Sequence, residues 1–530
     1  MELNVRAFLE RAQIYFPQNE IVSRCPDGSL FRYSYREMGS RARKIASRFE
    51  SLGIRPGDKV ATFAWNTHRH YELYFALPSY GAVLHTVNIR LSDEHIAYIL
   101  NHSEDVCVFA DSDLFPVLER IAPQLRTVRT FVALDEAVPR TSLAPVVAYE
   151  DLVRGGDEGF GFREIDEHTP AVMCYTSATT GNPKGVLYTH RAIYLHTSVL
   201  CFADGFGFRE SDTFLPMVPM FHANAWGIPF AAAWMGSKMV LPGERPRAVD
   251  ILDLIESERV TFAAAPVSVG IEMVNELQKK RRDLGSVRAI LLGGQATPKA
   301  VMDFFQSEFG IPIYTAWGST ELAPIATFSH IKRHQLGWSA EEKIGIRVRQ
   351  GMASPGVELK VLGEDGSPVP WDDRHVGEAY VRAPWGSTSY YNDPRSAEGF
   401  VDGWWKSGDM ATIDQEGVLR LVDRAKDLIK SGGEWISSIE LENALMAHPG
   451  VREAAVVAMP HEKWLERPVA YVARRPEAPG VGDADLIEWL SPRFAKWWLP
   501  DRFVFVDEIP KTGVGKFDKR RLRERARNPE

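Results

Sequence analysis

The chain has 530 residues, which is too long for one ordinary hydrophobic core, so we expect two or more domains. Hydrophobic residues make up 45% of the sequence and charged residues 25%, the composition of a soluble globular protein. Lys and Arg number 62, and Asp and Glu number 70, a net charge of -8. This balance argues against a nucleic-acid binder, because such proteins carry a basic excess or a basic stripe.

The first residues and the cysteines point to a cytoplasmic protein without a disulfide framework. Residues 1–16 are charged and amphipathic with no apolar signal region, and no apolar run is long enough to span a bilayer. The four cysteines show no CxxC spacing and no accompanying histidine cluster. That spacing favours reduced thiols over a structural zinc site.

Helical and strand patterns alternate through most of the chain. Residues 35–52 carry apolar side chains at helical spacing with Ser34 as the N-cap, and a short apolar strand follows at 59–65. Residues 71–84 predict a helix that leads into a strand, and 105–111 and 287–294 are further buried strands. We therefore expect an α/β fold with largely parallel sheets, whose ligands bind at the carboxyl ends of the strands.

The remainder of the chain divides into two smaller regions. Residues 350–422 are rich in Gly, Pro and short β patterns, which predicts a compact β subdomain within a large N-terminal domain of residues 1–422. A helix and strand pattern then begins anew, which predicts a small α+β C-terminal domain of residues 427–530. We place the boundary at 423–426.

A loop rich in hydroxyl groups, YTSATTGNPKG at residues 175–185, follows a buried strand. Its backbone N–H groups and hydroxyls can wrap phosphate oxygens, and Lys184 adds a positive charge. The spacing is not Gly-x4-Gly-Lys-Ser/Thr, so a Walker-type NTPase is disfavoured. An ordinary surface loop is the alternative interpretation of this segment alone.

Four further motifs follow in order: AWGSTEL at 316–322, GWWKSGD at 403–409, DRAKDLIKSGGEWIS at 423–437 and PKTGVGK at 510–516. With the loop, they make nearly the whole chain resemble the adenylate-forming superfamily of acyl-CoA synthetases, luciferases and peptide-synthetase adenylation domains. The segments PMFHANAWG, GGEWISSIELENALMAHP and FAKWWLPD are most similar to medium- and long-chain fatty acyl-CoA synthetases and methylthiopropionate-CoA ligases.

The resemblance implies an acid–thiol ligase that uses ATP, Mg²⁺ and CoA. A carboxylate attacks the α-phosphate of ATP to give an acyl-adenylate and pyrophosphate, and the CoA thiol then displaces AMP. Because the first step brings one anion against another, it needs a metal ion, cationic side chains and oriented N–H groups.

The resemblance also assigns the nucleotide site residue by residue. The phosphate loop comprises Thr176, Ser177, Ala178, Thr179, Thr180, Gly181 and Lys184. Thr176 and Glu321 are the pair linked to magnesium. The nucleotide is also bound by Gly294, Gln295, Ala296, Ala316, Trp317, Gly318, Ser319 and Thr320, with Trp317 flanking adenine in the usual tyrosine position. Asp409 and Arg424 reach the ribose.

The remaining assignments concern catalysis and the second substrate. Lys516 bridges the carboxylate and the α-phosphate, and it is expected to act with Glu321, Lys184 and His222; His222 and Trp226 belong to the acyl pocket. Lys426 is the hinge about which the small domain rotates after adenylation. The CoA channel is lined by Lys430, Ser431, Gly432 and Gly433, and Trp435 in the same loop covers the adenine.

Three positions depart from the family pattern. Ala178 replaces the usual glycine of the phosphate loop, Ser407 replaces a frequent threonine, and Trp317 lacks the tyrosine hydroxyl. Two alternatives stay open: an adenylating enzyme that transfers the acyl group to an amine, and a nucleotide-binding relative without chemistry. The acid is not fixed by the sequence, and a homodimer is expected only by analogy.

Overall fold

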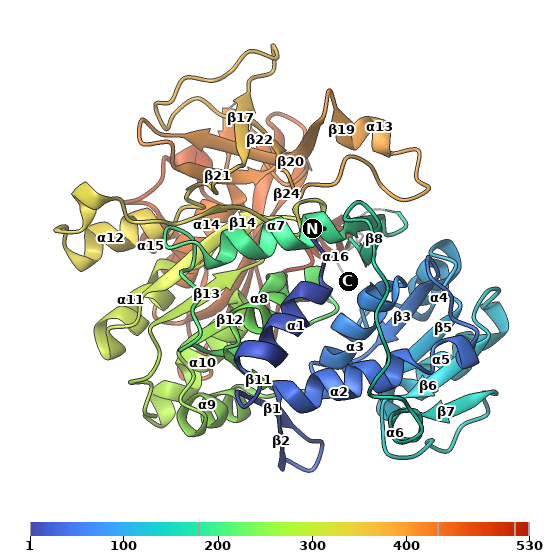
Figure 1. Cartoon of the computed structure of the whole chain (residues 1–530). Coiled ribbons are helices and arrows are strands. Elements are labelled where there is room, and N and C mark those ends of the chain that lie inside the picture. The colour runs from blue at the N-terminus through green and yellow to red at the C-terminus, as the bar shows by residue number, and fades with distance from the viewer. Residues whose placement is uncertain (1, 177–180, 432–433, 513–515, 528–530) are drawn as a thin grey trace.

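Two large sheets and the helices between them form most of the molecule (Figure 1). The computed structural model describes residues 2–176, 181–431, 434–512 and 516–527. The first sheet has nine strands in the order β16-β15-β14-β13-β12-β10-β11-β1-β2 and is parallel from β1 to β14. Its strands are β1 (Glu20–Arg24), β2 (Leu30–Ser34), β10 (Thr213–Pro216), β11 (Lys238–Leu241), β12 (Phe262–Pro266), β13 (Ala289–Gly293), β14 (Ile313–Gly318), β15 (Ile325–Phe328) and β16 (Met352–Ala353).

The second sheet has seven strands in the order β7-β6-β5-β3-β4-β8-β9, all parallel except the β8–β9 pair. These are β3 (Lys59–Phe63), β4 (Val83–Thr86), β5 (Cys107–Ala110), β6 (Thr130–Ala133), β7 (Val146–Ala148), β8 (Pro170–Tyr175) and β9 (Gly185–Thr189). The expected α/β fold with largely parallel sheets is confirmed.

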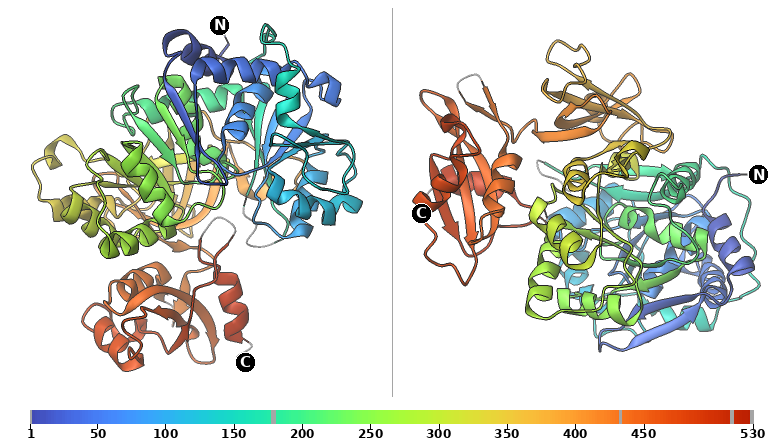
Figure 2. Two further views of the ribbon diagram at one scale, coloured as in Figure 1. Left: turned by 90° about the horizontal axis from the view of Figure 1, so that it is seen from below. Right: turned by 90° about the vertical axis from the view of Figure 1, so that its left-hand side faces the viewer.

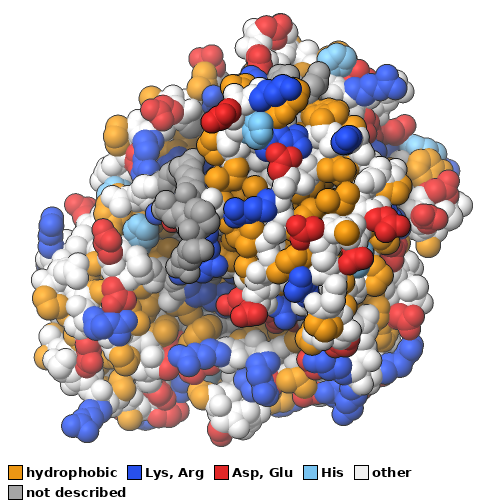
Figure 3. Space-filling view, turned by 180° about the vertical axis from the view of Figure 1, so that it is seen from behind, with side chains coloured by type: hydrophobic (Ala, Val, Ile, Leu, Met, Phe, Trp, Pro, Cys, Tyr) orange, Lys and Arg blue, Asp and Glu red, His pale blue; other side chains and the backbone are white. Residues whose placement is uncertain are grey.

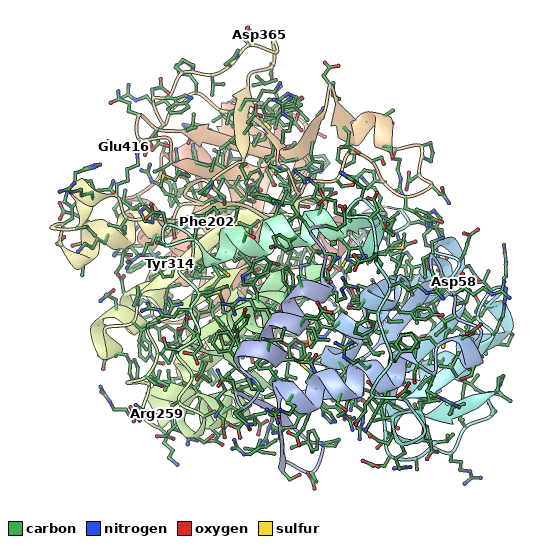
Figure 4. All side chains as sticks on the ribbon, in the orientation of Figure 1. Asp58, Phe202, Arg259, Tyr314, Asp365 and Glu416 are labelled. Atoms are coloured by element: carbon green, nitrogen blue, oxygen red, sulfur yellow. The ribbon has the colours of Figure 1, made fainter. Side chains whose placement is uncertain are left out.

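Helices from distant parts of the sequence share one core between the sheets. Phe8, Phe75, Ile193 and Phe230 come from α1 (Arg6–Tyr15), α3 (His68–Tyr80), α7 (His190–Cys201) and α8 (Ile228–Met235), and they pack in one buried cluster with side chains of both sheets. Side chains fill this space throughout (Figure 4). The core fixes the two sheets relative to one another because it is continuous with both.

The helices α2 (Tyr35–Ala46) and α6 (Tyr149–Arg154) add buried side chains to the same core. Other helices pack in two further clusters: α4 (Asp93–His102) and α5 (Phe115–Ile121) in one, and α9 (Ala248–Ser257), α10 (Val267–Lys279), α11 (Lys299–Phe309) and α12 (Ala340–Arg347) in the other. Ser34 caps α2 as predicted, in a capping box with Glu37, but the helix ends at Ala46 and only a 3-10 turn, Glu50–Leu52, continues the pattern. Within the described part of the chain, every helix is too short or too polar to cross a membrane.

A five-stranded antiparallel sheet follows, where the sequence predicted a β subdomain. It contains β17 (Glu358–Leu362), β18 (Gly377–Arg382), β19 (Phe400–Val401), β20 (Trp404–Ile413) and β21 (Leu419–Arg424), with α13 (Ser396–Gly399) before β19. We call everything from α1 to β21 the large lobe.

The last residues form a separate lobe, orange to red in Figure 2. This C-terminal lobe contains β22 (Ile429–Ser431), β23 (Glu434–Ile436), α14 (Ser438–Met446), β24 (Val451–His461), β25 (Leu465–Arg474), α15 (Asp483–Leu490), β26 (Arg502–Val506) and α16 (Lys519–Arg527). The chain leaves the sheet of β21 at Arg424 and enters the next sheet at Ile429. The function of 423–426 as a hinge stays a prediction.

Candidate active site

A cavity of about 770 Å³ lies where the two lobes meet. Its walls are the carboxyl ends of β8, β13 and β14, the ends of β20 and β21, and the residues around the start of α16. The predicted site residues that line it are Thr176, Lys184, His222, Trp226, Gly294, Gln295, Ala296, Ala316, Trp317, Gly318, Ser319, Thr320, Glu321, Asp409, Arg424, Lys426 and Lys516. The structure thus brings together residues that are up to 340 positions apart in the sequence (516 minus 176).

Other residues that the sequence predicted for the site are not among those that line the cavity. Ser177, Ala178, Thr179, Thr180, Gly432 and Gly433 lie outside the described residues. Lys430, Ser431 and Trp435 lie on the β22–β23 hairpin, where Lys430 Nζ is 4.9 Å from the centre of the Trp435 ring. They are not among the described residues that line the cavity, so the predicted cover over the adenine and the CoA channel stay predictions.

The phosphate loop is closed at its stem by two hydrogen bonds. The Thr176 N–H donates to the Lys184 carbonyl at 2.9 Å, and the Lys184 N–H donates to Thr176 Oγ1 at 3.2 Å. Lys184 Nζ lies 4.1 Å from the centre of the Tyr390 ring, a cation–π contact. Burial lowers the pKa of Lys184, and the Glu321 carboxylate opposes that shift.

Glu321 is buried beside the loop and is held by two hydroxyls. Tyr390 Oη donates to Glu321 Oε1 at 2.7 Å, and Ser319 Oγ donates to Oε2. A carboxylate and the Thr176 hydroxyl are hard oxygen donors of the kind that Mg²⁺ accepts. Among the described residues, no group of three or more Asp, Glu, His or Cys side chains is arranged to hold a metal ion by itself. Such a sparse donor set fits an ion that takes most of its ligands from phosphates and water.

The Asp409 carboxylate is fixed by two donors. The Trp317 indole Nε1 donates to Asp409 Oδ2 at 2.9 Å, and Arg424 Nε lies 2.7 Å from Asp409 Oδ1. The tryptophan therefore lacks the tyrosine hydroxyl but retains a hydrogen-bond donor, which it directs at the neighbouring carboxylate. Each carboxylate oxygen accepts two hydrogen bonds, so Asp409 still has lone pairs for a ligand.

Trp226 belongs to a left-handed turn, the 3-10 segment Ala223–Gly227, and His222 directly precedes this turn in an extended conformation. Trp226 packs so closely on Gly293, at the end of β13, that a Cβ there would lie 2.9 Å from its ring. Burial lowers the pKa of His222 to about 3, and the charge of Lys516 adds to this shift. The imidazole is therefore neutral at physiological pH.

Lys516 extends from the C-terminal lobe into the cavity. Its Cε lies 3.5 Å from the position that a Cβ on Gly294 would occupy. Burial and then the charge of Arg424 lower the pKa of Lys516 to about 8, against the opposing effect of Asp409 and Glu321. Burial also lowers the pKa of Lys426 at the predicted hinge, which lines the same cavity.

The sequence interpretation missed two cavity residues that contact the phosphate loop. Tyr390 contacts Lys184 and Glu321, and Arg395 donates from Nη1 to the carbonyl of Asn182 at 3.1 Å. Both lie in YYNDPRS, a loop after β18 whose residue types mark only a turn. No local pattern predicts that this loop reaches the phosphate loop about 200 positions earlier, between Asn182 and Arg395.

This arrangement of lobes and cavity defines an adenylate-forming enzyme, and comparison with known proteins agrees. Residues 9–391 match the family model of the AMP-binding enzymes, and 440–516 match the model of the AMP-binding enzyme C-terminal domain. The chain belongs to the AMP-binding enzyme family.

The relatives match over nearly their full length. The chain is 44% identical to a long-chain-fatty-acid–CoA ligase of Thermus thermophilus, with 99% of this chain and 96% of the relative covered. It is 38% identical to a 3-methylmercaptopropionyl-CoA ligase of Ruegeria lacuscaerulensis, covering 98% and 97%. An anthranilate CoA ligase crystallised with anthranoyl-AMP has the same fold, with a TM-score of 0.89 at 23% identity over 99% and 97% of the two chains.

The Trp317–Asp409 bond leads to a testable prediction. Trp317→Phe keeps an aromatic ring but leaves a buried carboxylate short of one donor, so it should reduce stability by about 1–3 kcal/mol. Thermal unfolding of the two single variants Trp317→Phe and Asp409→Asn and of the double variant measures the coupling. Fully additive effects would mean that the hydrogen bond contributes nothing.

Proposed function

We propose that the protein is an ATP-dependent acyl-CoA ligase, which activates a fatty or related carboxylic acid as an acyl-adenylate and then transfers the acyl group to CoA. The main support is Lys516, which comes from the second lobe and lies in one cavity with the phosphate-loop stem, Glu321 and Asp409. Full-length relatives that are named as acid–CoA ligases support the same reaction class.

In the first half-reaction, a carboxylate oxygen forms a bond to the α-phosphorus of ATP and the bond to the β-phosphate oxygen breaks. Negative charge collects on the leaving pyrophosphate. Lys516 would hold the carboxylate and the α-phosphate together by its ammonium group, and Lys184 would neutralise charge on the outer phosphates. His222, neutral because it is buried, would orient the acid as a hydrogen-bond partner.

Thr176 and Glu321 would hold Mg²⁺, which supplies charge neutralisation to the triphosphate when it is bound. Asp409 would accept the ribose hydroxyls, with its orientation fixed by Trp317 and Arg424. Trp226 would form a wall of the acyl pocket. A cytoplasmic location and a homodimer belong to the same proposal.

The second half-reaction requires the thiol to reach the adenylate that Lys516 covers. Rotation of the C-terminal lobe about Lys426 would remove the ammonium and admit CoA. In the observed arrangement the lobes are joined by polar contacts: Asp423 accepts from the backbone N–H of Ser438 at 2.8 Å and from its hydroxyl at 2.5 Å, and Arg420 pairs with Glu440 at 2.8 Å. Rotation would have to break these contacts.

The proposal is tested by incubating the purified protein with ATP, Mg²⁺ and a panel of short, medium, long and aryl acids, with and without CoA. Mass spectrometry should detect acyl-CoA only when CoA is present, together with AMP and pyrophosphate. An acyl-adenylate that accumulates with CoA untouched would overturn the proposal in favour of an amine acceptor. The absence of adenylate with every acid would favour a nucleotide-binding relative, and Ala178→Gly would then show whether the loop is responsible.

The low pKa of Lys516 predicts the pH dependence of adenylation. The ammonium form is required, and with a pKa of about 8 instead of the ordinary 10.5 it is present below pH 8 and lost above it. The kcat/KM for pyrophosphate release should therefore fall as the pH rises through about 8. The Lys516→Arg variant should be slower, but its kcat/KM should no longer fall above pH 8, because a guanidinium stays charged. If kcat/KM of that variant still falls through pH 8, the titrating group is not Lys516.

The contacts between the lobes predict an opposite effect on the two half-reactions. Glu440→Gln weakens the pair with Arg420 and should slow adenylation by up to about fivefold, since exposed ion pairs contribute at most about 1 kcal/mol. Thioester formation from supplied acyl-adenylate should be unchanged or faster. Glu358→Gln, which breaks an exposed pair with Arg382 inside the β subdomain, is the control. Equal slowing of both half-reactions by Glu440→Gln would contradict the prediction.

A further inference from the structure

The loop of residues 390–395 contacts the phosphate loop, Glu321 and the seven-stranded sheet. The Tyr391 N–H donates to the carbonyl of Gly185, at the end of the phosphate loop, at 2.8 Å. Tyr390 contacts both Lys184 and Glu321, and Lys59 Nζ of the seven-stranded sheet lies 5.0 Å from the centre of the Tyr391 ring. The loop is therefore fixed against the site from several directions, so a side chain that it carries is held in place.

Arg395 is the cation that this loop presents to the cavity. Its Nη1 donates to the carbonyl of Asn182 at 3.1 Å and lies 3.7 Å from where a Cβ on Gly181 would be. Its Nε and Nη2 donate to Asp393, whose side chain is only 5% exposed. The Arg395 side chain itself is 32% exposed and lines the mouth of the cavity.

These contacts use three of the five guanidinium N–H groups, so two have no partner among the described residues. Asp393 fixes the plane of the guanidinium, and the Asn182 carbonyl fixes its distance from the phosphate loop. An arginine whose donors are held in this way suits a phosphate group, because the planar fork matches two phosphate oxygens.

The two lysines that are proposed to act on the phosphates, Lys516 and Lys184, have other neighbours. Lys516 lies beside Gly294, on the adenine side of the predicted site, and Lys184 is held against the face of Tyr390. Arg395 is beside Gly181 and Asn182, in the part of the phosphate loop that the outer phosphates of ATP would contact. Its charge is screened on one side by Asp393 but open on the side that faces the cavity.

We propose that Arg395 binds the outer phosphates of ATP and stabilises pyrophosphate as it leaves. The inference rests on the proposed adenylation reaction. When the bond between the α-phosphorus and the bridging oxygen breaks, its electron pair goes to pyrophosphate, and the two remaining N–H groups of Arg395 donate hydrogen bonds to the pyrophosphate oxygens. Arg395 stays protonated throughout, and no other reactant is needed.

The test separates the half-reactions. Arg395→Gln should raise the KM for pyrophosphate, in the formation of ATP from acyl-adenylate and pyrophosphate, by at least about tenfold to a hundredfold, the range expected for each charge-assisted hydrogen bond that is lost. Thioester formation from acyl-adenylate and CoA should stay within about twofold of the unmodified enzyme. Arg395→Lys, which keeps the charge, should restore part of the loss.

Two controls make the outcome decisive. Arg382→Gln removes an arginine of the same β subdomain that pairs with Glu358 on the surface, and it should change neither half-reaction. Asp393→Asn disturbs the loop but keeps the cation, so a purely structural role of Arg395 predicts that this variant and Arg395→Gln behave alike. Equal loss in both half-reactions, or an unchanged KM for pyrophosphate, would overturn the inference.

The same data distinguish this inference from the proposed function. If the unmodified enzyme forms no acyl-CoA from acyl-adenylate but still makes ATP from acyl-adenylate and pyrophosphate in a way that depends on Arg395, the CoA ligase proposal fails and the role of Arg395 stands. If acyl-CoA forms normally and Arg395→Gln leaves the KM for pyrophosphate unchanged, the CoA ligase proposal stands and the role of Arg395 fails.

Discussion

The repulsion between two anions is the constraint on which this structure depends. A carboxylate and a triphosphate come together only where positive charge and N–H donors are already oriented and water is excluded. The fold meets this requirement by assembling groups from separate elements: the stem of the loop after β8, the end of β14, the β20–β21 pair and the start of α16. Because the C-terminal lobe supplies Lys516, the cavity is complete only when the lobes are in the observed arrangement.

Burying lysine ammonium groups in such a cavity costs free energy, and the surrounding carboxylates offset part of that cost. Burial lowers the pKa values of Lys516, Lys184 and Lys426, while Asp409, Glu321 and Asp427 act against these shifts. A site with bound phosphates would favour the charged lysines more strongly. The face of the molecule in Figure 3 carries both acidic and basic side chains, and the cavity lining also contains both, so the positive charge offered to phosphates comes from individual residues such as Lys184, Arg395 and Lys516.

The sequence predicted the fold class and a part of the cavity lining, because its motifs lie at the carboxyl ends of strands or in the loops that follow them. It could not predict that the Trp317 indole donates to Asp409, since the contact depends on how β14 and β20 lie together. Tyr390 and Arg395 were missed for a similar reason, as their loop gives only a turn signal. Trp435 lies on the β22–β23 hairpin beside Lys430, and its predicted cover over the adenine stays a prediction.

The conformation of the turn between His222 and Gly227 could not be predicted from the sequence pattern, because it depends on the burial of its side chains. Ala223, Asn224, Ala225 and Trp226 all have positive φ, between 42° and 58°, and none is glycine. Each costs about 1–2 kcal/mol relative to the right-handed conformation. The turn persists because all four side chains are buried and Trp226 packs on Gly293, so the surrounding core imposes the conformation. This packing holds the Trp226 ring against the cavity, so its position depends on the core.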